Sequence, residues 1–348
     1  MKTGNLKAPY VIPVFIPFQG CPNKCFFCNQ NAVTGVDKPL LPGKDELFNH
    51  FEKFLSYSLG KKDFVEIAFF GGNFLGMDND IVLKYLNIAK EYAAGKKNIS
   101  IRFSTRPDTI TNESLELIKK FNVKTIELGV QSMDDTVLKK SGRGHTAKDS
   151  LNAADLIKNK FPHIRLGLQV MPGLPGETRT SILKTLDFIR YSLPSYLRIY
   201  PLVVLKNTHL EKLYKKGLFK PLDLDQAVEI SSLIRDFAVR RNVNIIRTGL
   251  PPDGQANDEI VAGPWHPSFG ELVIQKSFYK KILIRILSSL IVTENKTLIV
   301  KINPKSESSV RGCKNSNFFN LKKRFNFKDI KTKKNTDFQK DSFEICIL

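Results

Sequence analysis

The chain has 348 residues, of which 42% are hydrophobic and 25% charged, so it can bury a sizeable core and is not disordered as a whole. Basic residues outnumber acidic ones by 54 to 34, a formal net charge of +20, which favours a polyanionic partner unless it reflects a general bias toward lysine. The longest apolar stretch, residues 282–292, is broken by Arg285, and the first ten residues lack the apolar core of a secretion signal; we therefore expect no transmembrane helix and a cytoplasmic location.

Short apolar segments alternate with helical patterns through the first 240 residues. The segments are rich in Val, Ile, Phe and Leu, which is typical of parallel strands covered on both faces, and they occupy residues 10–18, 65–70, 99–105, 125–130, 165–171 and 196–203. Amphipathic helices are predicted at residues 44–57, 79–93, 112–120, 146–158, 179–191 and 223–240. Polar residues such as Thr111 and Asp223 stand where helix N-caps belong. Six consecutive βα units predict an α/β fold with a partial (βα)6 parallel barrel, whose functional residues follow the strands.

The sequence changes character after residue 242. Residues 243–248 have the pattern of a further strand, and a block rich in Gly and Pro follows them. Residues 276–348 contain 17 basic and 6 acidic side chains, against 37 and 28 in the first 275 residues. An alternating segment at 298–302, a helical pattern at 315–325 and the final residues 342–348 predict a small β-α-β appendage. We therefore divide the chain into a partial barrel at residues 1–242 and a basic C-terminal α+β module at residues 243–348.

Three of the five cysteines, Cys21, Cys25 and Cys28, form a C-x3-C-x2-C pattern directly after the first predicted strand. Three thiolates can ligate three irons of a [4Fe-4S] cluster and leave the fourth iron open for a small molecule. A structural zinc site needs a fourth ligand, and Cys313 and Cys346 are remote in sequence and paired neither with each other nor with His. We predict a [4Fe-4S] cluster at the first three cysteines, with zinc or incidental buried cysteines as the alternatives.

The spacing of these cysteines, their place after a first strand and the aromatic Phe27 before the last of them resemble the radical S-adenosylmethionine (SAM) superfamily, over about residues 8–240. The resemblance implies that the open iron binds SAM, and that an electron from the cluster cleaves SAM to methionine and a 5′-deoxyadenosyl radical. An electron donor such as flavodoxin or ferredoxin is then an expected partner. In such an enzyme the cofactor carries the radical chemistry, while the barrel positions the substrate and excludes water.

A glycine pair after the second predicted strand resembles a SAM-binding motif of that superfamily. Gly71, Gly72 and Asn73 match its Gly-Gly-Glu motif, whose backbone binds the SAM amino group. Asn73 replaces the acid, which leaves the role of the side chain open. The alternative is a tight βα turn, for which two glycines are equally suited.

Polar residues after the fourth and fifth predicted strands carry the rest of the resemblance to SAM sites. Gln131 and Gln169 are similar to residues that hydrogen-bond SAM in coproporphyrinogen-oxidase-like enzymes, and Arg143 to one that pairs with the SAM carboxylate. The alternative for all three is a hydrogen bond that ties a strand end to a loop. The segment MPGLPGET at residues 171–178 resembles a loop that contacts adenine, and it also fits a plain Gly-Pro turn before a helix.

The combined motifs indicate one branch of the superfamily. GGNF, STRPD, ELGVQSMDD, SGRGHT, MPGLPGET and IYP together resemble the radical SAM core of the Elongator complex catalytic subunit and its stand-alone bacterial relatives. That subunit modifies the wobble uridine of tRNA with SAM and acetyl-CoA, and it carries an acetyltransferase domain after the core. Here the residues after 242 contain no pyrophosphate-binding loop of that kind, so we expect no acetyl-CoA chemistry.

Basic residues favour tRNA or another RNA as the substrate. Some lie near the predicted barrel mouth, namely Arg106, Lys139, Lys140 and Arg143. Others lie in the tail, where Lys322, Lys323 and Arg324 are interleaved with Phe318, Phe319, Phe325 and Phe327. Aromatic rings can stack bases while cations contact phosphates. The alternative is that these phenylalanines form the core of the module and the lysines its solvated face.

Three further residues are candidates for a substrate-side role as general acid or base: His145, Tyr200 and His266. The block at residues 263–270, which contains His266, also fits a structural turn that closes the open side of the barrel. Two other functions stay open. A radical SAM enzyme acting on a small metabolite would show no salt-sensitive RNA binding, and a non-catalytic Fe–S RNA-binding protein would hold a cluster without cleaving SAM.

Overall fold

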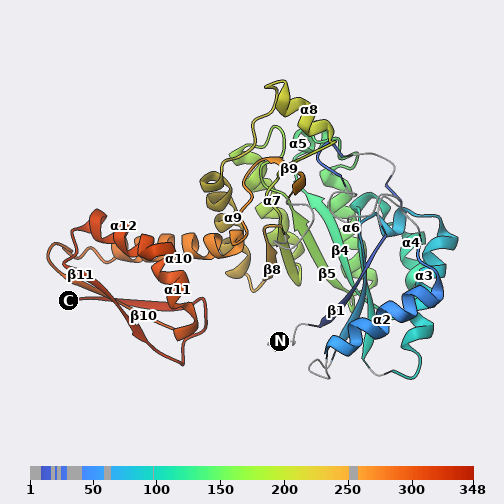
Figure 1. The fold of residues 1–348 in the computed structure, drawn as a ribbon, viewed down its shortest axis with the longest axis horizontal. Coiled ribbons are helices and arrows are strands. Elements are labelled where there is room, and N and C mark those ends of the chain that lie inside the picture. The colour runs from blue at the N-terminus through green and yellow to red at the C-terminus, as the bar shows by residue number, and fades with distance from the viewer. Residues whose placement is uncertain are drawn as a thin grey trace.

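A curled sheet with helices on its outer side forms the larger part of the molecule, and a smaller body is joined to it by a long helix (Figure 1). The computed structural model describes residues 9–16, 20–21, 25–29, 41–58, 64–96, 98–250 and 258–348. Among these residues no helix combines the length and the apolar character needed to cross a membrane.

The large sheet has seven strands in the order β1-β2-β3-β4-β5-β6-β8, and all neighbours are parallel. The strands are β1 Tyr10–Phe15, β2 Val65–Phe70, β3 Ile99–Thr105, β4 Val123–Gln131, β5 Arg165–Val170, β6 Tyr196–Ile199 and β8 Asn244–Thr248. The predicted partial barrel is confirmed, with one strand more than the six βα units required. Because β8 pairs with β6, the sheet continues past residue 242, where we divided the chain; that division stays a prediction.

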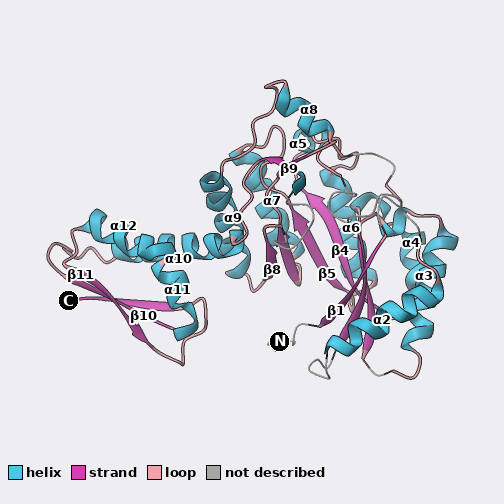
Figure 2. Cartoon of the chain, in the orientation of Figure 1, coloured by secondary structure: helices cyan, strands magenta, loops and turns pink. Residues whose placement is uncertain are grey.

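Helices cover the outer face of the sheet (Figure 2). The six that were predicted are α2 Lys44–Ser58, α3 Asn79–Ala93, α4 Asn112–Ile118, α6 Ala147–Lys160, α7 Arg179–Ser192 and α9 Leu224–Val239. Thr111 and Asp223 cap two of them as predicted, since each side chain accepts a hydrogen bond from a backbone N–H of the first turn. Two short helices of the barrel, α5 Asp135–Lys140 and α8 His209–Lys215, were missed because they are too short to show periodicity. The 20-residue helix α10 Phe269–Ser288, which follows the barrel, was also not predicted.

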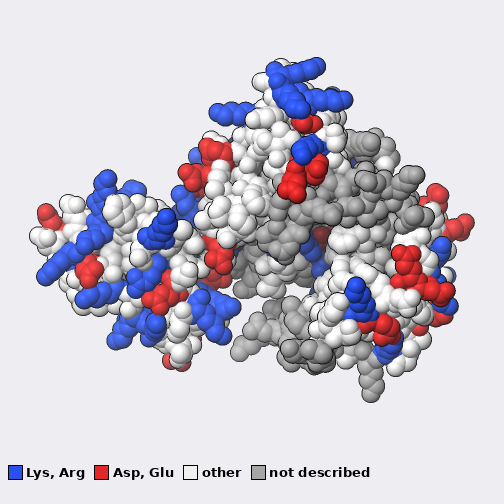
Figure 3. Space-filling view, viewed as in Figure 1, with Lys and Arg blue, Asp and Glu red and all other residues white. Residues whose placement is uncertain are grey.

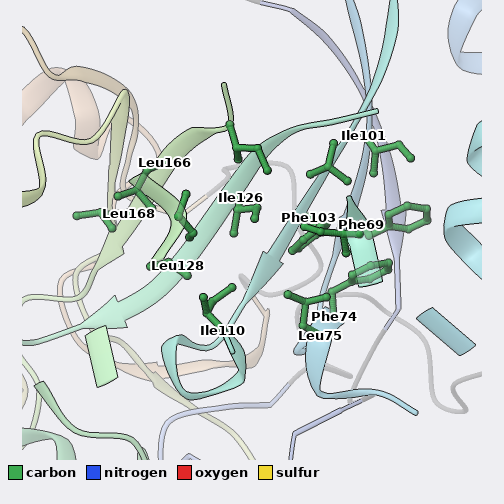
Figure 4. Close-up of a cluster of buried hydrophobic side chains, with 14 of the residues drawn as sticks. Phe69, Phe74, Leu75, Ile101, Phe103, Ile110, Ile126, Leu128, Leu166 and Leu168 are labelled. Carbon is green, nitrogen blue, oxygen red and sulfur yellow. The ribbon is translucent and has the colours of Figure 1, made fainter. Parts of the chain in front are cut away.

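The core lies between the sheet and these helices, and alternate strand residues fill it (Figure 4). One part of it supports the turn after β2. The ring of Phe74, in the 3-10 turn η1 Phe74–Gly76, stacks between Phe69 and Phe103, with centroid distances of 4.9 and 4.8 Å. Such stacked pairs stabilise beyond the area they bury, by roughly 0.5–1.5 kcal/mol each. The glycine turn that precedes Phe74 is therefore fixed to the core.

The C-terminal body has its own sheet and its own core. Its elements are α10 Phe269–Ser288, β10 Thr297–Ile302, η4 Pro304–Ser306, α11 Glu307–Arg311, η5 Cys313–Asn315, α12 Ser316–Phe325, β11 Asp329–Lys334 and β12 Phe343–Ile347. β10 pairs with β11 in parallel and with β12 antiparallel. The predicted β-α-β appendage is confirmed in β10, α12 and β12, whereas β11 was missed because four of its six residues are charged. A two-stranded antiparallel sheet, β7 Val204–Leu205 with β9 Ile260–Ala262, joins segments on either side of α8, α9 and β8.

The aromatic residues of the tail mostly belong to this second core. Phe318 and Phe327 are buried, and Phe325 packs against them. Phe319 is 67% exposed. The structure therefore favours the alternative in which these phenylalanines hold the module together, and it leaves Phe319 as the one of the four that is open for base stacking.

Candidate metal and cofactor site

The described part of the cysteine loop packs against the segment that follows α5. The backbone N–H of Phe26 donates to the Ser141 carbonyl at 3.0 Å, and its carbonyl accepts from Leu210 N–H at 2.8 Å. The Phe26 ring lies 4.2 Å from the His209 ring and so close to Gly142 that a Cβ there would stand 2.6 Å from it. Phe26, which the sequence did not single out, thus anchors the loop to two other elements.

Phe27, which the sequence did single out, is half-buried and packs against an apolar cluster that includes Val137, Leu174 and Leu210. Cys21 is exposed, and Cys25 and Cys28 are half-buried. Among the described residues, no three side chains of His, Cys, Asp or Glu converge on a preformed metal site. The structure therefore places the three thiols on one loop, and the ligand set stays a prediction.

Arg143 connects the cysteine loop to the end of β4. Its Nη2 donates to the Gly129 carbonyl at 2.5 Å, and its Nη1 lies 3.3 Å from Cys25 Sγ. The residue is 8% exposed, and its Nε is buried with no hydrogen-bond partner among the described residues. A buried guanidinium beside a thiol, with a donor to spare, is suited to a carboxylate or thiolate.

A second buried guanidinium lies at the end of β3. Arg106 is 3% exposed and forms a bidentate pair with Asp108, with N–O distances of 2.9 and 2.8 Å. Burial opposes ionisation of this carboxyl, but the hydrogen bonds and charge of Arg106 outweigh it and lower the pKa of Asp108. Arg106 is therefore engaged inside the protein, whereas Lys139 and Lys140, the other predicted cations near the mouth, are exposed.

Gln131 and Gln169 meet at the ends of β4 and β5. Gln169 Nε2 donates to Gln131 Oε1 at 3.4 Å. Gln131 has φ +66°, a left-handed conformation that is costly for a residue with a side chain and that occurs often at functional sites. The structure thus brings these two strand-end residues together, and Gln131 lies two positions after Gly129, to which Arg143 is bonded.

Asn73 joins three segments of this end of the barrel. Its Oδ1 accepts hydrogen bonds from Thr105 Oγ1, the backbone N–H of Arg106 and Thr109 Oγ1, at 2.7, 2.9 and 3.0 Å. Its Nδ2 donates to the carbonyl of Gly20, the residue before Cys21, at 2.7 Å. Asn73 is fully buried, so its side chain positions the cysteine loop against β2 and β3.

The glycines around Asn73 leave room for this contact. Gly20 has φ +71°, and a Cβ there would stand 2.2 Å from the Asn73 carbonyl oxygen. Gly71 has φ +97° and, like Gly72, is half-buried. The turn therefore needs glycine for its conformation and for the close approach of the two loops.

The three candidate acid–base residues have different surroundings. His145 is 3% exposed, its Nε2 lies 3.3 Å from the Val130 carbonyl, and burial with the charge of Arg143 lowers its pKa to about 3. His266 accepts a hydrogen bond from Ser268 N–H at Nδ1 within the turn before α10. Tyr200 accepts one from Arg198 at 2.9 Å. His145 has a buried Nδ1 with no hydrogen-bond partner among the described residues, and Tyr200 belongs to a polar network inside the barrel. The acid–base role of all three residues stays a prediction.

That network lies on the inner face of the sheet and was missed from the sequence. Ile67 and Ile126 point to the helices and are buried in the main core, so their strand neighbours Glu66 and Glu127 point inward. Glu127 Oε2 accepts from Arg102 Nη2 at 2.6 Å and from Arg198 Nε at 2.8 Å. Burial opposes ionisation of Glu127, but Arg198 and Arg102 outweigh it and lower the pKa of the carboxyl.

The other inward carboxylate of the network binds a third arginine. Glu66 Oε1 accepts from Arg165 Nη2 at 2.5 Å and from Thr125 Oγ1 at 2.6 Å. Charged residues at alternate positions of otherwise apolar strands were the available sequence signal. They pair in space only because β2 to β6 lie side by side.

Residues 15–189 match the family model of the radical SAM superfamily. The chain belongs to this superfamily. Residues 194–280 match the model of the radical SAM C-terminal domain. The predicted resemblance is therefore confirmed.

Relatives of different function are similar to this radical SAM chain. The tRNA uridine(34) acetyltransferase of Methanocaldococcus infernus is 29% identical over 50% of this chain and 32% of its own length. The heme chaperone HemW of Buchnera aphidicola is 28% identical over 57% of this chain and 52% of its own length. The chain thus spans about a third of the length of the first of these relatives and about half of the second.

A solved structure supports the same fold. The archaeal Elp3 of Methanocaldococcus infernus, with residues 1–46 deleted, superposes with a TM-score of 0.59 at 22% identity, over 80% of this chain and 63% of that one. Members of this superfamily are known by a [4Fe-4S] cluster and SAM. Three thiols on one loop, a buried guanidinium with a spare donor and polar strand ends form a donor set that fits both groups.

Proposed function

We propose that the protein is a radical SAM iron–sulfur enzyme that modifies tRNA or another RNA. The observation that carries the enzymatic part is the contact of Arg143 with Cys25 Sγ at 3.3 Å. It places a buried cation with a free donor beside the loop that would hold the cluster. When bound, the cluster and SAM supply one-electron reductive cleavage of SAM.

The protein's own residues have distinct roles in this proposal. Cys21, Cys25 and Cys28 would hold the cluster, and an electron donor such as flavodoxin or ferredoxin is the expected partner. Arg143 holds the carboxylate of SAM by a charge-assisted hydrogen bond, and Gln131 lies beside it at the end of β4. The backbone of Gly71 and Gly72 and the side chain of Gln169 complete the SAM pocket.

Two observations support an RNA substrate. One relative is a tRNA uridine(34) acetyltransferase, and the C-terminal module presents Lys and Arg over much of its visible surface (Figure 3). Lys322, Lys323 and Arg324 are exposed on α12 and form no ion pair with other described residues. Their charge is therefore available to phosphates, whose neutralisation gives salt-dependent binding.

The test is anaerobic reconstitution of the cluster, followed by reduction in the presence of SAM, with and without bulk tRNA. We expect 5′-deoxyadenosine to form, and to form faster with tRNA. Replacing Cys21, Cys25 and Cys28 together by alanine should abolish bound iron and the product. Replacing the exposed Cys313 and Cys346 by alanine is the matched control and should change neither.

Three other results would each contradict one part of the proposal: the cofactor, the catalytic activity or the RNA substrate. Zinc in place of iron in the parent protein, or a full cluster in the triple variant, would contradict the cofactor assignment. A cluster without 5′-deoxyadenosine would favour a non-catalytic protein, the class to which the similarity to a heme chaperone points. Product formation without any tRNA binding at low salt would favour a small-molecule substrate.

A further inference from the structure

Two arginines stand side by side on the inner face of the sheet. Arg198 on β6 and Arg247 on β8 are partners in a parallel pair, so both side chains leave the sheet on the same face. That face is the inner one, because Arg198 Nε bonds Glu127 there. Like charges directly opposite each other on neighbouring strands destabilise a sheet. The pair is therefore unfavourable without a counter-charge.

A β-bulge creates this arrangement. β8 follows β6 in register up to Ile245, opposite Leu197, and the register then shifts so that Arg247 faces Arg198. Without the extra residue, Ile246 would stand opposite Arg198, and Arg247 would turn to the face that α9 and α10 cover. Bulges that redirect a side chain occur often beside binding sites. Here the bulge brings a second guanidinium inward.

The carboxylates of the inner face are already engaged. Glu127 is shared by Arg198 and Arg102, and Glu66 is bound by Arg165. Arg247 is half-buried and forms no hydrogen bond or ion pair with any residue that the structure describes. Among the residues that the structure describes, the protein therefore supplies no counter-charge to Arg247.

A hydroxyl group adds a further donor. Tyr200 Oη accepts a hydrogen bond from Arg198 Nη1 at 2.9 Å, so its own O–H is left to donate to another acceptor. Two guanidinium groups and a hydroxyl group are donors that suit an oxyanion. Arginine in particular binds phosphate and carboxylate through two parallel hydrogen bonds.

We propose that Arg198, Arg247 and Tyr200 form an oxyanion-binding site inside the barrel, which holds a phosphate or carboxylate group of the substrate. The inference rests on the proposed function in one respect, namely that the substrate enters the barrel. It adds that the substrate carries an anionic group close to the reacting position. A nucleotide phosphate and the carboxylate of a small metabolite share this chemistry.

The test compares reconstituted holoprotein variants for stabilisation by inorganic phosphate, measured as the shift in melting temperature. Arg247→Gln should need at least tenfold more phosphate than the parent for the same shift, and Arg247→Lys should lie between them. Arg179→Gln, which removes an exposed arginine on α7, is the control of equal charge and should respond like the parent. Equal responses of Arg247→Gln and Arg179→Gln would overturn the proposal.

Stability without added anions separates binding from a structural role. Because Arg247→Gln removes a like-charge contact, it should melt no lower than the parent in phosphate-free buffer. A clear loss of stability in both Arg247→Gln and Arg247→Lys would instead assign Arg247 to the fold and overturn the proposal.

A 5′-phosphorylated dinucleotide and citrate distinguish the two sources of the anion. Stabilisation by the dinucleotide that depends on Arg247 supports the site and a nucleotide substrate. Stabilisation by citrate alone supports the site and contradicts the RNA proposal. Conversely, salt-sensitive tRNA binding together with an unaltered phosphate response in Arg247→Gln would leave the RNA proposal standing and refute the site.

Discussion

Replacing Asn73 by alanine should destabilise the protein and release the cysteine loop at the same time. The change removes the acceptor of Arg106 N–H, which is buried, and the donor to the Gly20 carbonyl, which is half-buried. Thr105 and Thr109 can still bond each other at 2.8 Å, so two groups lose their partner. An unsatisfied buried group costs roughly 1–3 kcal/mol and a half-buried one less, which gives a loss of about 3 kcal/mol in unfolding free energy. That is a large share of the roughly 5–15 kcal/mol that stabilises a native protein.

Asn73→Asp keeps the acceptor and removes the donor. The carboxylate can still accept from Thr105, Thr109 and the backbone of Arg106, but it cannot donate to the Gly20 carbonyl. We expect a loss of stability at least as large as in Asn73→Ala, because a carboxylate at this fully buried position also loses its hydration and lies against the Gly20 carbonyl oxygen. Iron should be lost as in Asn73→Ala, because Gly20 directly precedes Cys21.

The assay is urea denaturation followed by circular dichroism, together with iron content after anaerobic reconstitution. Asn152→Ala, at an exposed position of α6, is the control and should change neither quantity. If Asn73→Ala unfolded within about 0.5 kcal/mol of this control, the usual range of surface substitutions, the positioning role argued for Asn73 would be refuted.

Three further predictions concern the half-buried carboxyl of Glu177, the SAM pocket and the basic module. Burial raises the pKa of the Glu177 carboxyl from its ordinary value of 4.5 to about 7. The stability that its neutral form contributes is therefore fully present below pH 4.5 and is lost as the pH rises through 7. Glu177→Gln should exceed the parent in unfolding free energy by about 2 kcal/mol at pH 8 and match it at pH 4.5, as measured by denaturation. Arg143→Gln should weaken SAM binding to the reconstituted protein at least tenfold, because a charge-assisted hydrogen bond contributes roughly 1.5–3 kcal/mol, and Arg143→Lys should weaken it less. Reversing Lys322, Lys323 and Arg324 to glutamate should lower tRNA affinity and flatten its logarithmic salt dependence by roughly 0.7 to 0.9 per lost phosphate contact, measured by filter binding.

Each of these has a control in the same chain. A stability profile of Glu177→Gln parallel to that of the parent between pH 4.5 and 8 would contradict the raised pKa. Arg179→Gln should leave SAM affinity unaltered, and an equal affinity in Arg143→Gln would show that the carboxylate is held elsewhere. The control reverses Lys84, Lys90 and Lys120, which are exposed on α3 and after α4. These helices lie on the opposite side of the molecule from α12 (Figure 1), so the change should weaken tRNA binding less than the reversal on α12. An equal effect would remove the module from the RNA interface.

The sequence by itself determined the elements whose signals are local. Apolar runs such as residues 65–70 predicted parallel strands, because both faces of such strands are buried. Short polar residues such as Thr111 and Asp223 predicted helix starts, because a helix N-terminus needs a nearby acceptor. The cysteine spacing predicted one loop with three thiols, and the family match confirmed the superfamily that it indicated.

Tertiary structure decided which distant residues meet. Asn73 holds Gly20 through a hydrogen bond across 53 positions of the chain, and no local pattern encodes that contact. The sequence predicted Arg106 as a free cation at the barrel mouth, but its guanidinium is buried and bonded to Asp108. Phe318 and Phe327 are interleaved with cations in the sequence, as in a nucleic-acid surface, yet α12 and the turn after it bury both rings in the core of the module. The direction of Arg247 was likewise fixed by one bulge in the pairing of β6 and β8, because strand register sets the face of each side chain.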